Sequence, residues 1–281
     1  MFEIFRASAP AKVNLSLRVL RRRDDGFHDL ETRMCPLSLC DEVALELRES
    51  GGVRLTCDDP ELPVGEDNLA LMAVRAFESA VGREVDAEIS ITKRIPSGAG
   101  LGGGSSDAAA VLRLLNQALE TKLTLMELSP IASKIGSDVP FFLFGQSCDA
   151  SGRGEVIKPI EFSASPALLL VKPPFGIPTP WAYSRWRDSE ENPAFAYGAQ
   201  NLPFGELVND LERPVFEKYL VLGDLKRWLL AQPEVDGALM SGSGATVFAV
   251  LGNPDDTERL AERTRSEFGD TFWTQGAMVN A

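Results

Sequence analysis

The chain has 281 residues, of which 44% are hydrophobic and 25% are charged, and this composition is typical of a soluble, enzyme-sized protein with a substantial core. Its 28 Lys and Arg against 41 Asp and Glu leave a net charge of −13, which argues against a nucleic-acid partner held by its phosphates. The apolar runs are shorter than the roughly 20 residues that a membrane span needs, and residues 1–20 lack the pattern of a cleaved signal. We therefore expect a cytoplasmic protein with neither a membrane nor a nucleic acid as its partner.

Two scarce residue types limit the chemistry. The four cysteines contain no C-x-x-C pair, so their spacing predicts neither a zinc knuckle nor a redox motif, and we expect Cys35, Cys40, Cys57 and Cys148 to be reduced. His28 is the only histidine, which excludes a metal site built from several histidines. Any Ser-His-Asp arrangement would have to use that one ring.

Alternating apolar residues predict three strands near the N-terminus. Residues 12–20 place Val and Leu on one face and Lys12, Asn14 and a serine on the other, which is typical of a half-buried strand. Residues 43–47 and 53–57 alternate in the same way, so we expect an antiparallel sheet.

Helical periodicity begins after these strands. A helix is predicted over 67–81, with Asp67 as its N-cap and Gly82 as its stop. The further predicted elements are a strand at 87–91, helices at 105–119 and 124–134, a strand at 167–172, helices within 215–231, strands at 236–240 and 245–250, a helix at 254–267 and a strand at 271–279.

Strands and helices that interleave without a regular βαβα repeat favour the α+β class. We place a domain boundary near residue 160, which gives domains 1–160 and 161–281. Residues 173–203 fit no period and are rich in proline and aromatic residues. A loop of that length in a compact domain is usually functional, so we expect it to face the substrate.

A glycine-rich run over residues 96–110 is the most informative segment. Five of the seven residues 98–104 are glycine, which lets the backbone turn its N–H groups toward a single point. Ser105, Ser106 and Asp107 can cap the alanine-rich helix that follows, whose N-terminus carries a partial positive charge. A strand, a loop of bare amides and a helix start together predict a phosphate site, whereas a flexible linker would not be flanked in this way.

The context of the run excludes two common phosphate loops. A P-loop needs Gly-Lys followed by Ser or Thr, and that sequence is absent. Gly98, Gly100 and Gly103 satisfy G-x-G-x-x-G, but a Rossmann fold needs a second parallel strand that ends in an acidic residue about 20 residues later. Residues 121–136 have a helical pattern instead.

The order of Pro-x-x-x-Gly-Leu-Gly and Ser-Ser from Pro96 resembles the GHMP kinase superfamily, which includes galactokinase, homoserine kinase and mevalonate kinase. Pro-Ala-Lys-Val-Asn-Leu from Pro10 resembles the first motif of that superfamily, and Ser-Gly-Ser-Gly-Ala-Thr-Val-Phe from Ser241 resembles its third. Four features resemble the branch that phosphorylates a cytidine diphosphate sugar alcohol, namely Gly-Phe-His-Asp-Leu-Glu-Thr from Gly26, the triple glycine 102–104, Gly-Ser-Asp-Val-Pro-Phe-Phe from Gly136 and Asn-Asp-Leu-Glu from Asn209.

The resemblance implies a fold, two cofactors and a catalytic pair. The fold is α+β in two domains, the first like domain 2 of ribosomal protein S5 and the second ferredoxin-like, with ATP and Mg²⁺ bound at the cleft between them. Asp138 would take the proton of the attacking hydroxyl, and Lys12 would neutralise charge in the transition state. Without the resemblance, Asp138 could equally cap a short helix, and Lys12 would be an ordinary surface lysine.

The same resemblance implies the residues that bind the two substrates. Ser106 is expected to contact Mg²⁺ as well as ATP. Thr246, Gly242 and Gly244 are expected to pack against the glycine-rich loop that begins at Pro96. The residues expected to bind ATP are Pro96, Ser97, Gly98, Ala99, Gly100, Leu101, Gly102, Gly103, Gly104, Ser105 and Ser106.

On the acceptor side, His28 would read the edge of the cytosine and Tyr183 would stack on it. The full expected set is Asn14, Phe27, His28, Arg153, Thr179 and Tyr183. Phe27 stands where relatives commonly carry tyrosine, so one hydroxyl is missing. A lone histidine can also be a solvated loop residue, Tyr183 can be packing only, and the arginines at 21–23 can be a solvated run.

Two other functions remain open on the sequence. Another GHMP kinase with a small-molecule substrate would share Lys12, Asp138 and the glycine loop, but would have no use for His28 and Tyr183. A non-catalytic member that binds a nucleotide or metabolite would not need Asp138 at all.

Overall fold

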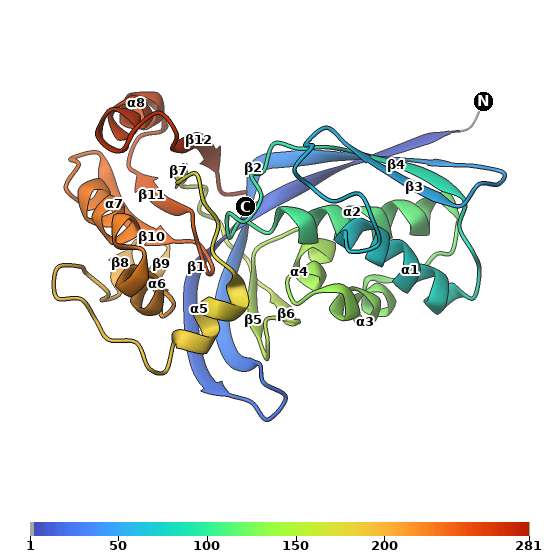
Figure 1. The fold of residues 1–281 in the computed structure, drawn as a ribbon, viewed down its shortest axis with the longest axis horizontal. Coiled ribbons are helices and arrows are strands. Elements are labelled where there is room, and N and C mark those ends of the chain that lie inside the picture. Colours follow the sequence, from blue (N-terminus) through green and yellow to red (C-terminus); the bar gives the residue numbers. More distant parts are fainter. Residues whose placement is uncertain (1–2, 281) are drawn as a thin grey trace.

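Two long antiparallel strands form the axis of the fold in the computed structural model, which describes residues 3–280. β1 (Ile4–Arg22) and β2 (His28–Leu47) pair along almost their whole length and end in a hairpin at the lower edge of the view (Figure 1). The predicted strand at 12–20 is therefore right in kind but too short. Lys12 and Asn14 are almost as buried as Val13 and Leu15, so the expected half-buried strand is wrong over residues 12–15. From Leu15 to Leu20 the strand alternates in burial as predicted. Loops from both halves of the molecule cover its polar face.

The larger sheet has eight strands and is mostly antiparallel. Its main order is β3–β4–β2–β1–β9–β8, and β5 and β6 extend it from β2. The pairs β3–β4 and β1–β9 are parallel, which corrects the expectation of a purely antiparallel sheet. The further strands are β3 (Val53–Cys57), β4 (Ala87–Thr92), β5 (Cys148–Ser151), β6 (Val156–Pro159), β8 (Gln200–Leu202) and β9 (Gly205–Asn209).

Four helices cover one face of this sheet (Figure 1). They are α1 (Leu69–Val81), α2 (Gly103–Ala118), α3 (Leu125–Ile135) and α4 (Val139–Phe144). Gly82 ends α1 in the left-handed conformation, as predicted, but the N-cap is Asn68 rather than Asp67. Asn68 directly precedes the first helical residue, and its side chain accepts a hydrogen bond from the amide of Ala70 at 2.9 Å.

The smaller sheet has four antiparallel strands in the order β10–β11–β7–β12. These strands are β7 (Ala167–Lys172), β10 (Val235–Met240), β11 (Val247–Leu251) and β12 (Trp273–Met278), and α6 (Glu212–Lys218), α7 (Leu220–Leu230) and α8 (Thr257–Phe268) lie beside them. Residues 173–203 are not wholly irregular, because they contain α5 (Thr179–Arg185) and β8. Pro180 at the start of α5 fits a position where no amide donor is needed.

The core is continuous between the two sheets. One buried cluster contains Leu15 of β1 together with Leu168 and Leu170 of β7 and Leu239 of β10. β8 and β9 follow residue 160 and nevertheless join the larger sheet, so the boundary at 160 stays a prediction. All four cysteines are free thiols, as expected. Within residues 3–280, no helix combines the length and apolarity that crossing a bilayer requires.

Leu15→Ala tests whether this shared cluster holds the two halves together. We expect it to lower the free energy of unfolding by about 2–5 kcal/mol while urea unfolding remains a single transition, because the cluster draws on both sheets. Leu220→Ala is the control, because Leu220 is 51% exposed and its loss should change stability by less than about 0.5 kcal/mol. Two separate transitions in the unmodified protein, or a loss in Leu15→Ala no larger than that in Leu220→Ala, would contradict the shared core.

Candidate active site

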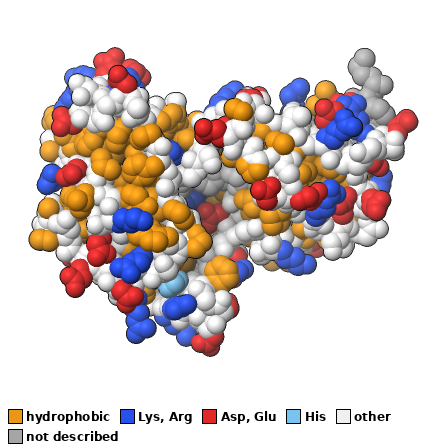
Figure 2. Space-filling view, in the orientation of Figure 1, with side chains coloured by type: hydrophobic (Ala, Val, Ile, Leu, Met, Phe, Trp, Pro, Cys, Tyr) orange, Lys and Arg blue, Asp and Glu red, His pale blue; other side chains and the backbone are white. Residues whose placement is uncertain are grey.

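A cleft of about 1350 Å³ lies between the two halves of the molecule. Figure 2 shows this face hollowed between the part that carries α6 to α8 and the part that carries α1 to α4. At one end the walls are the segment at 62–69 and the glycine loop, and at the other they are the β1–β2 hairpin and α5. Every sequence-predicted site residue except Ser106 lines this cleft.

The glycine loop leads from β4 into α2. Gly102 is the N-cap of α2 in a left-handed conformation, with φ of 75°, and no side chain caps the helix. The predicted caps Ser105, Ser106 and Asp107 are therefore wrong, because these residues already lie within the first turn. The amides of Gly103, Gly104 and Ser105 precede the first hydrogen bond of the helix, which the Ser106 amide donates to the Gly102 carbonyl at 2.9 Å. These free amides carry the partial positive charge of the helix start, which suits an anion.

Ser106 and Asp107 have unusual surroundings. Both are buried, and the Ser106 Oγ and the Asp107 Oδ1 lack a hydrogen-bond partner within residues 3–280. The Asp107 Oδ2 lies 2.7 Å from the Nζ of Lys93, which also lies 2.5 Å from Asp41. Burial raises the pKa of Asp107 to about 7, although the Lys93 charge opposes that rise. Sequence reasoning missed Lys93 and Asp41, which lie 52 residues apart and carry no motif of their own.

A second glycine-rich loop, residues 241–246, packs on the first. The Ser241 Oγ donates to the carbonyl oxygen of Gly100 at 3.0 Å. The amide of Thr246 donates to the carbonyl oxygen of Ala99 at 3.1 Å. Gly100 has φ of 74°, and a Cβ there would overlap the Ser241 carbonyl oxygen and lie 2.8 Å from that of Gly244. The expected packing of Gly242, Gly244 and Thr246 against the glycine loop is confirmed.

Lys12 and Asp138 face each other across the cleft. The Lys12 Nζ lies 3.8 Å from the Asp138 Oδ2 and donates to Asn14 Oδ1 at 2.6 Å and to the Gly100 carbonyl at 3.0 Å. Burial lowers the pKa of Lys12, and the Asp138 carboxylate opposes that shift. Asp138 precedes α4, but its side chain makes no capping hydrogen bond and is 37% exposed. The capping alternative therefore does not apply, and the carboxylate is free to meet a substrate hydroxyl.

Asn14 is held by a residue that sequence reasoning missed. Its Nδ2 donates to the Thr32 Oγ1 at 2.7 Å, and Thr32 in turn donates to the carbonyl of Ser16 at 2.6 Å. This orientation directs the Asn14 Oδ1 toward Lys12. Thr32 is buried on β2, opposite the Lys12 strand, and only the strand register reveals it.

The hairpin end of the cleft is aromatic. His28 and Tyr183 stack with ring centroids 5.5 Å apart and an interplanar angle of 27°, and Trp186 meets His28 edge-on at 6.0 Å. His28 is largely buried rather than solvated, and burial together with the charge of Arg22 lowers its pKa. The imidazole is therefore neutral near pH 7 and offers one donor and one acceptor. Trp186 was not predicted, although it lies three residues after Tyr183.

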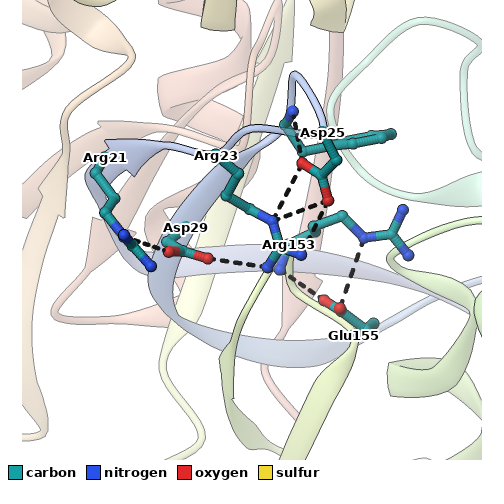
Figure 3. Close-up of polar contacts among 7 residues, drawn as sticks. Arg21, Arg23, Asp25, Asp29, Arg153 and Glu155 are labelled. Carbon is teal, nitrogen blue, oxygen red and sulfur yellow. Dashed lines mark hydrogen bonds and ion pairs between the residues drawn. The ribbon is translucent and has the colours of Figure 1, made fainter.

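Phe27 and Arg153 form the outer rim of this end. The Arg153 guanidinium lies 4.7 Å from the centroid of the half-exposed Phe27 ring, and its Nε lies 3.5 Å from Glu155. Arg23 pairs with Asp25 and Asp29 in the adjacent hairpin (Figure 3). The expected solvated run holds for Arg21 and Arg22, which are exposed, while Arg21 and Arg23 also form ion pairs with acidic residues of the hairpin.

Thr179 links α5 to the 241–246 loop, because its Oγ1 lies 2.8 Å from the Ser243 Oγ. Thr179, Tyr183 and Trp186 line the cleft, whereas residues 189–203 do not. The prediction that the segment 173–203 faces the site therefore holds for its first half only.

Two family models match the chain. Residues 68–146 match the GHMP kinases N terminal domain, and residues 199–270 match the GHMP kinases C terminal model. A solved structure of homoserine kinase from Cytophaga hutchinsonii has a TM-score of 0.67 at 19% identity over 99% of this chain and 95% of that one, which shows a shared fold.

Closer relatives agree on one enzyme. The chain is 41% identical to 4-diphosphocytidyl-2-C-methyl-D-erythritol kinase of Geobacter metallireducens over 90% of this chain and 92% of the relative, and 40% identical to that of Methylacidiphilum infernorum over 94% and 93%. A crystal structure of 4-(cytidine 5'-diphospho)-2C-methyl-D-erythritol kinase superposes with a TM-score of 0.81 at 35% identity, covering 99% of this chain and 100% of the other. The chain therefore belongs to the 4-diphosphocytidyl-2-C-methyl-D-erythritol kinase family of the GHMP kinases.

Proposed function

We propose that the protein transfers the γ-phosphoryl group of ATP to the 2-hydroxyl of 4-diphosphocytidyl-2-C-methyl-D-erythritol, a step of non-mevalonate isoprenoid synthesis. The observation that carries this proposal is the pair of Lys12 and Asp138, 3.8 Å apart, in a cleft that joins a phosphate-binding loop to an aromatic pocket. A kinase of this kind needs a nucleotide site, an acceptor site and a reacting centre between them.

Asp138 serves as the general base in this proposal. Its carboxylate accepts the proton of the acceptor hydroxyl as that oxygen attacks the γ-phosphorus, and the bond from the phosphorus to the ADP oxygen breaks. The Lys12 ammonium, fixed by Asn14 and the Gly100 carbonyl, neutralises charge on the transferred group.

The phosphates of ATP fit the amides at the start of α2 and the glycine loop before it. The unpartnered oxygens of Ser106 and Asp107 are of the kind that Mg²⁺ prefers, so these two residues fit an ion at this helix start. Within residues 3–280 no group of three His, Cys, Asp or Glu side chains could hold a metal alone, so phosphate and water oxygens would complete its coordination. Mg²⁺ bound with ATP supplies charge neutralisation at the β- and γ-phosphates.

The aromatic end suits the cytosine of the acceptor. The Phe27 ring offers a face for stacking, and the neutral His28 offers one donor and one acceptor to the edge of the base. Arg153 lines the cleft beside Phe27, and its guanidinium can meet the diphosphate. Thr179 and Tyr183 complete the wall on the α5 side.

Asp138→Asn tests the base. Turnover should fall about 10²- to 10⁴-fold, while the KM for ATP stays within about threefold because the nucleotide end of the cleft is unchanged. A coupled ADP-release assay that offers the cytidine substrate beside mevalonate, homoserine and galactose measures both. Asp224→Asn is the control, since that exposed carboxylate pairs only with Arg227 on α7. Turnover of another alcohol in place of the cytidine compound would refute the substrate, and no ADP from any of them would refute the kinase.

His28→Ala tests recognition of the base. The ratio of kcat/KM for the cytidine substrate to that for its uridine analogue should fall by roughly ten- to a hundredfold, because the edge contacts are lost. Tyr183→Phe keeps the ring that stacks on His28 and should keep the ratio. An unchanged ratio in His28→Ala would assign base selectivity to other residues.

The pH profile of kcat tests the charge on Lys12. Because burial lowers its pKa, the ammonium is lost as pH rises through a value below the usual 10.4 or so of lysine, and kcat should fall there. The arginine in Lys12→Arg stays charged over the whole pH range. The variant should therefore show no fall of kcat at high pH, although its kcat should be lower than that of the original protein at every pH. If kcat of Lys12→Arg still falls at high pH, the loss of a proton from a group other than Lys12 causes that fall.

A further inference from the structure

The Asn-Asp-Leu-Glu motif that begins at Asn209 lies outside the cleft and has no part in the proposed reaction. Asn209 is the last residue of β9 and pairs in register with Leu17 of β1, the strand that carries Lys12. Its side chain is buried, with 3% of the residue exposed. A buried carboxamide needs partners for its donors and its acceptor, so the contacts of Asn209 indicate what it does.

All of those contacts are to the backbone. The Asn209 Nδ2 donates to the carbonyl oxygens of Met240 at 2.7 Å and Gly242 at 2.8 Å. Its Oδ1 accepts from the amide of Leu211 at 2.9 Å. The two donated bonds span the point where β10 ends and the 241–246 loop begins, so they fix the direction in which that loop leaves the strand.

The loop held in this way leaves no room for a side chain between its backbone and Lys12. A Cβ at Gly242 would lie 3.2 Å from the Lys12 Nζ and 3.3 Å from the Asn14 Oδ1, so this backbone is the wall on which both side chains rest. Ser241 acts by a second route. Its Oγ donates to the same Gly100 carbonyl that accepts from Lys12, and therefore fixes the acceptor of the lysine as well.

We infer that Asn209 is a positioning residue for Lys12, acting through the backbone of Ser241 and Gly242. It does not touch the substrates, and it keeps the ammonium aligned with Asp138 by holding the wall behind it. The inference rests on the proposed function, in which Lys12 acts on the transferred group. A displacement of about 1 Å at such a centre can cost roughly a hundredfold in rate, so the hydrogen bonds of Asn209 should be visible in kcat.

Asn209→Asp and Asn209→Ala test this. Aspartate is nearly isosteric and keeps the acceptor for Leu211, but it loses both donors, whereas alanine removes all three bonds. We expect kcat per folded molecule to fall about ten- to a hundredfold in both, with the KM for ATP and for the cytidine substrate within about threefold of the original. The folded fraction is measured by circular dichroism in the assay buffer.

Gln200→Ala is the matched control. Gln200 on β8 also makes two hydrogen bonds to the backbone of β10, both to Ala238, at 2.8 and 3.0 Å. Ala238 lies two positions before Met240, away from the loop and the cleft. Loss of the Gln200 side chain should lower the free energy of unfolding about as much as the Asn209 substitutions do, and it should leave kcat unchanged. The comparison therefore separates positioning of Lys12 from a general loosening of β10.

The double variant Asn209→Asp/Ser241→Ala adds a second readout. If both residues act on Lys12 through one loop, their effects on kcat should be clearly less than multiplicative. Values of kcat within twofold of the original in both Asn209 variants, or a loss confined to KM, would overturn the inference while leaving the kinase intact. A fall of kcat in Gln200→Ala equal to that in Asn209→Ala would overturn it too. Absence of turnover in the unmodified protein would instead overturn the proposed function, and this inference with it.

Discussion

The carbonyl oxygen of Gly100 is the point at which the two halves of the site meet. It accepts a hydrogen bond from Lys12 on β1 and another from Ser241 on the loop after β10. The 241–246 loop comes this close only because Gly100 has no side chain, since a Cβ there would overlap the Ser241 carbonyl oxygen. Gly100 also adopts a left-handed conformation that other residues rarely take. Close approach of two backbones therefore determines the shape of the glycine loop.

This junction places a charged lysine where water is scarce. Taking an ammonium out of water is costly unless hydrogen bonds and an opposite charge compensate for it. Lys12 has two oxygen acceptors, from Asn14 and Gly100, and the carboxylate of Asp138 nearby. Part of the cost persists, since burial is the largest influence on its pKa. A cation with little hydration acts more strongly on a nearby phosphoryl group than one in water.

Much of the architecture follows from patterns that are local in sequence. The glycine run, Lys12, Asp138 and His28 lie in short motifs, and the structure brings them to one cleft. The strands and helices of the smaller sheet also lie close to their predicted ranges.

What the sequence could not predict depends on partners distant in the chain. Asp107 looks like a helix cap, but it pairs with Lys93, which in turn pairs with Asp41 on another strand. Thr32 and Trp186 show their roles only once β2 lies beside β1 and α5 lies beside the hairpin. The N-cap of α1 shifted by one residue because Asp and Asn cap equally well, and the backbone geometry decides between them.

The partnership of β1 with β9 also determines when the site can form during synthesis. β1 precedes the other described strands in the chain, but its neighbour β9 lies 192 residues later, as the contact between Arg18 and Asp210 illustrates. Until then β1 has an unpaired edge, and Lys12 has no wall behind it until residues 241–246 have emerged. Contacts of such separation slow folding, and an exposed strand edge invites pairing with other chains. The strand that carries Lys12 therefore stays incomplete until residues 205–209 and 241–246 have been made, and this is the period in which a chaperone would be of most use.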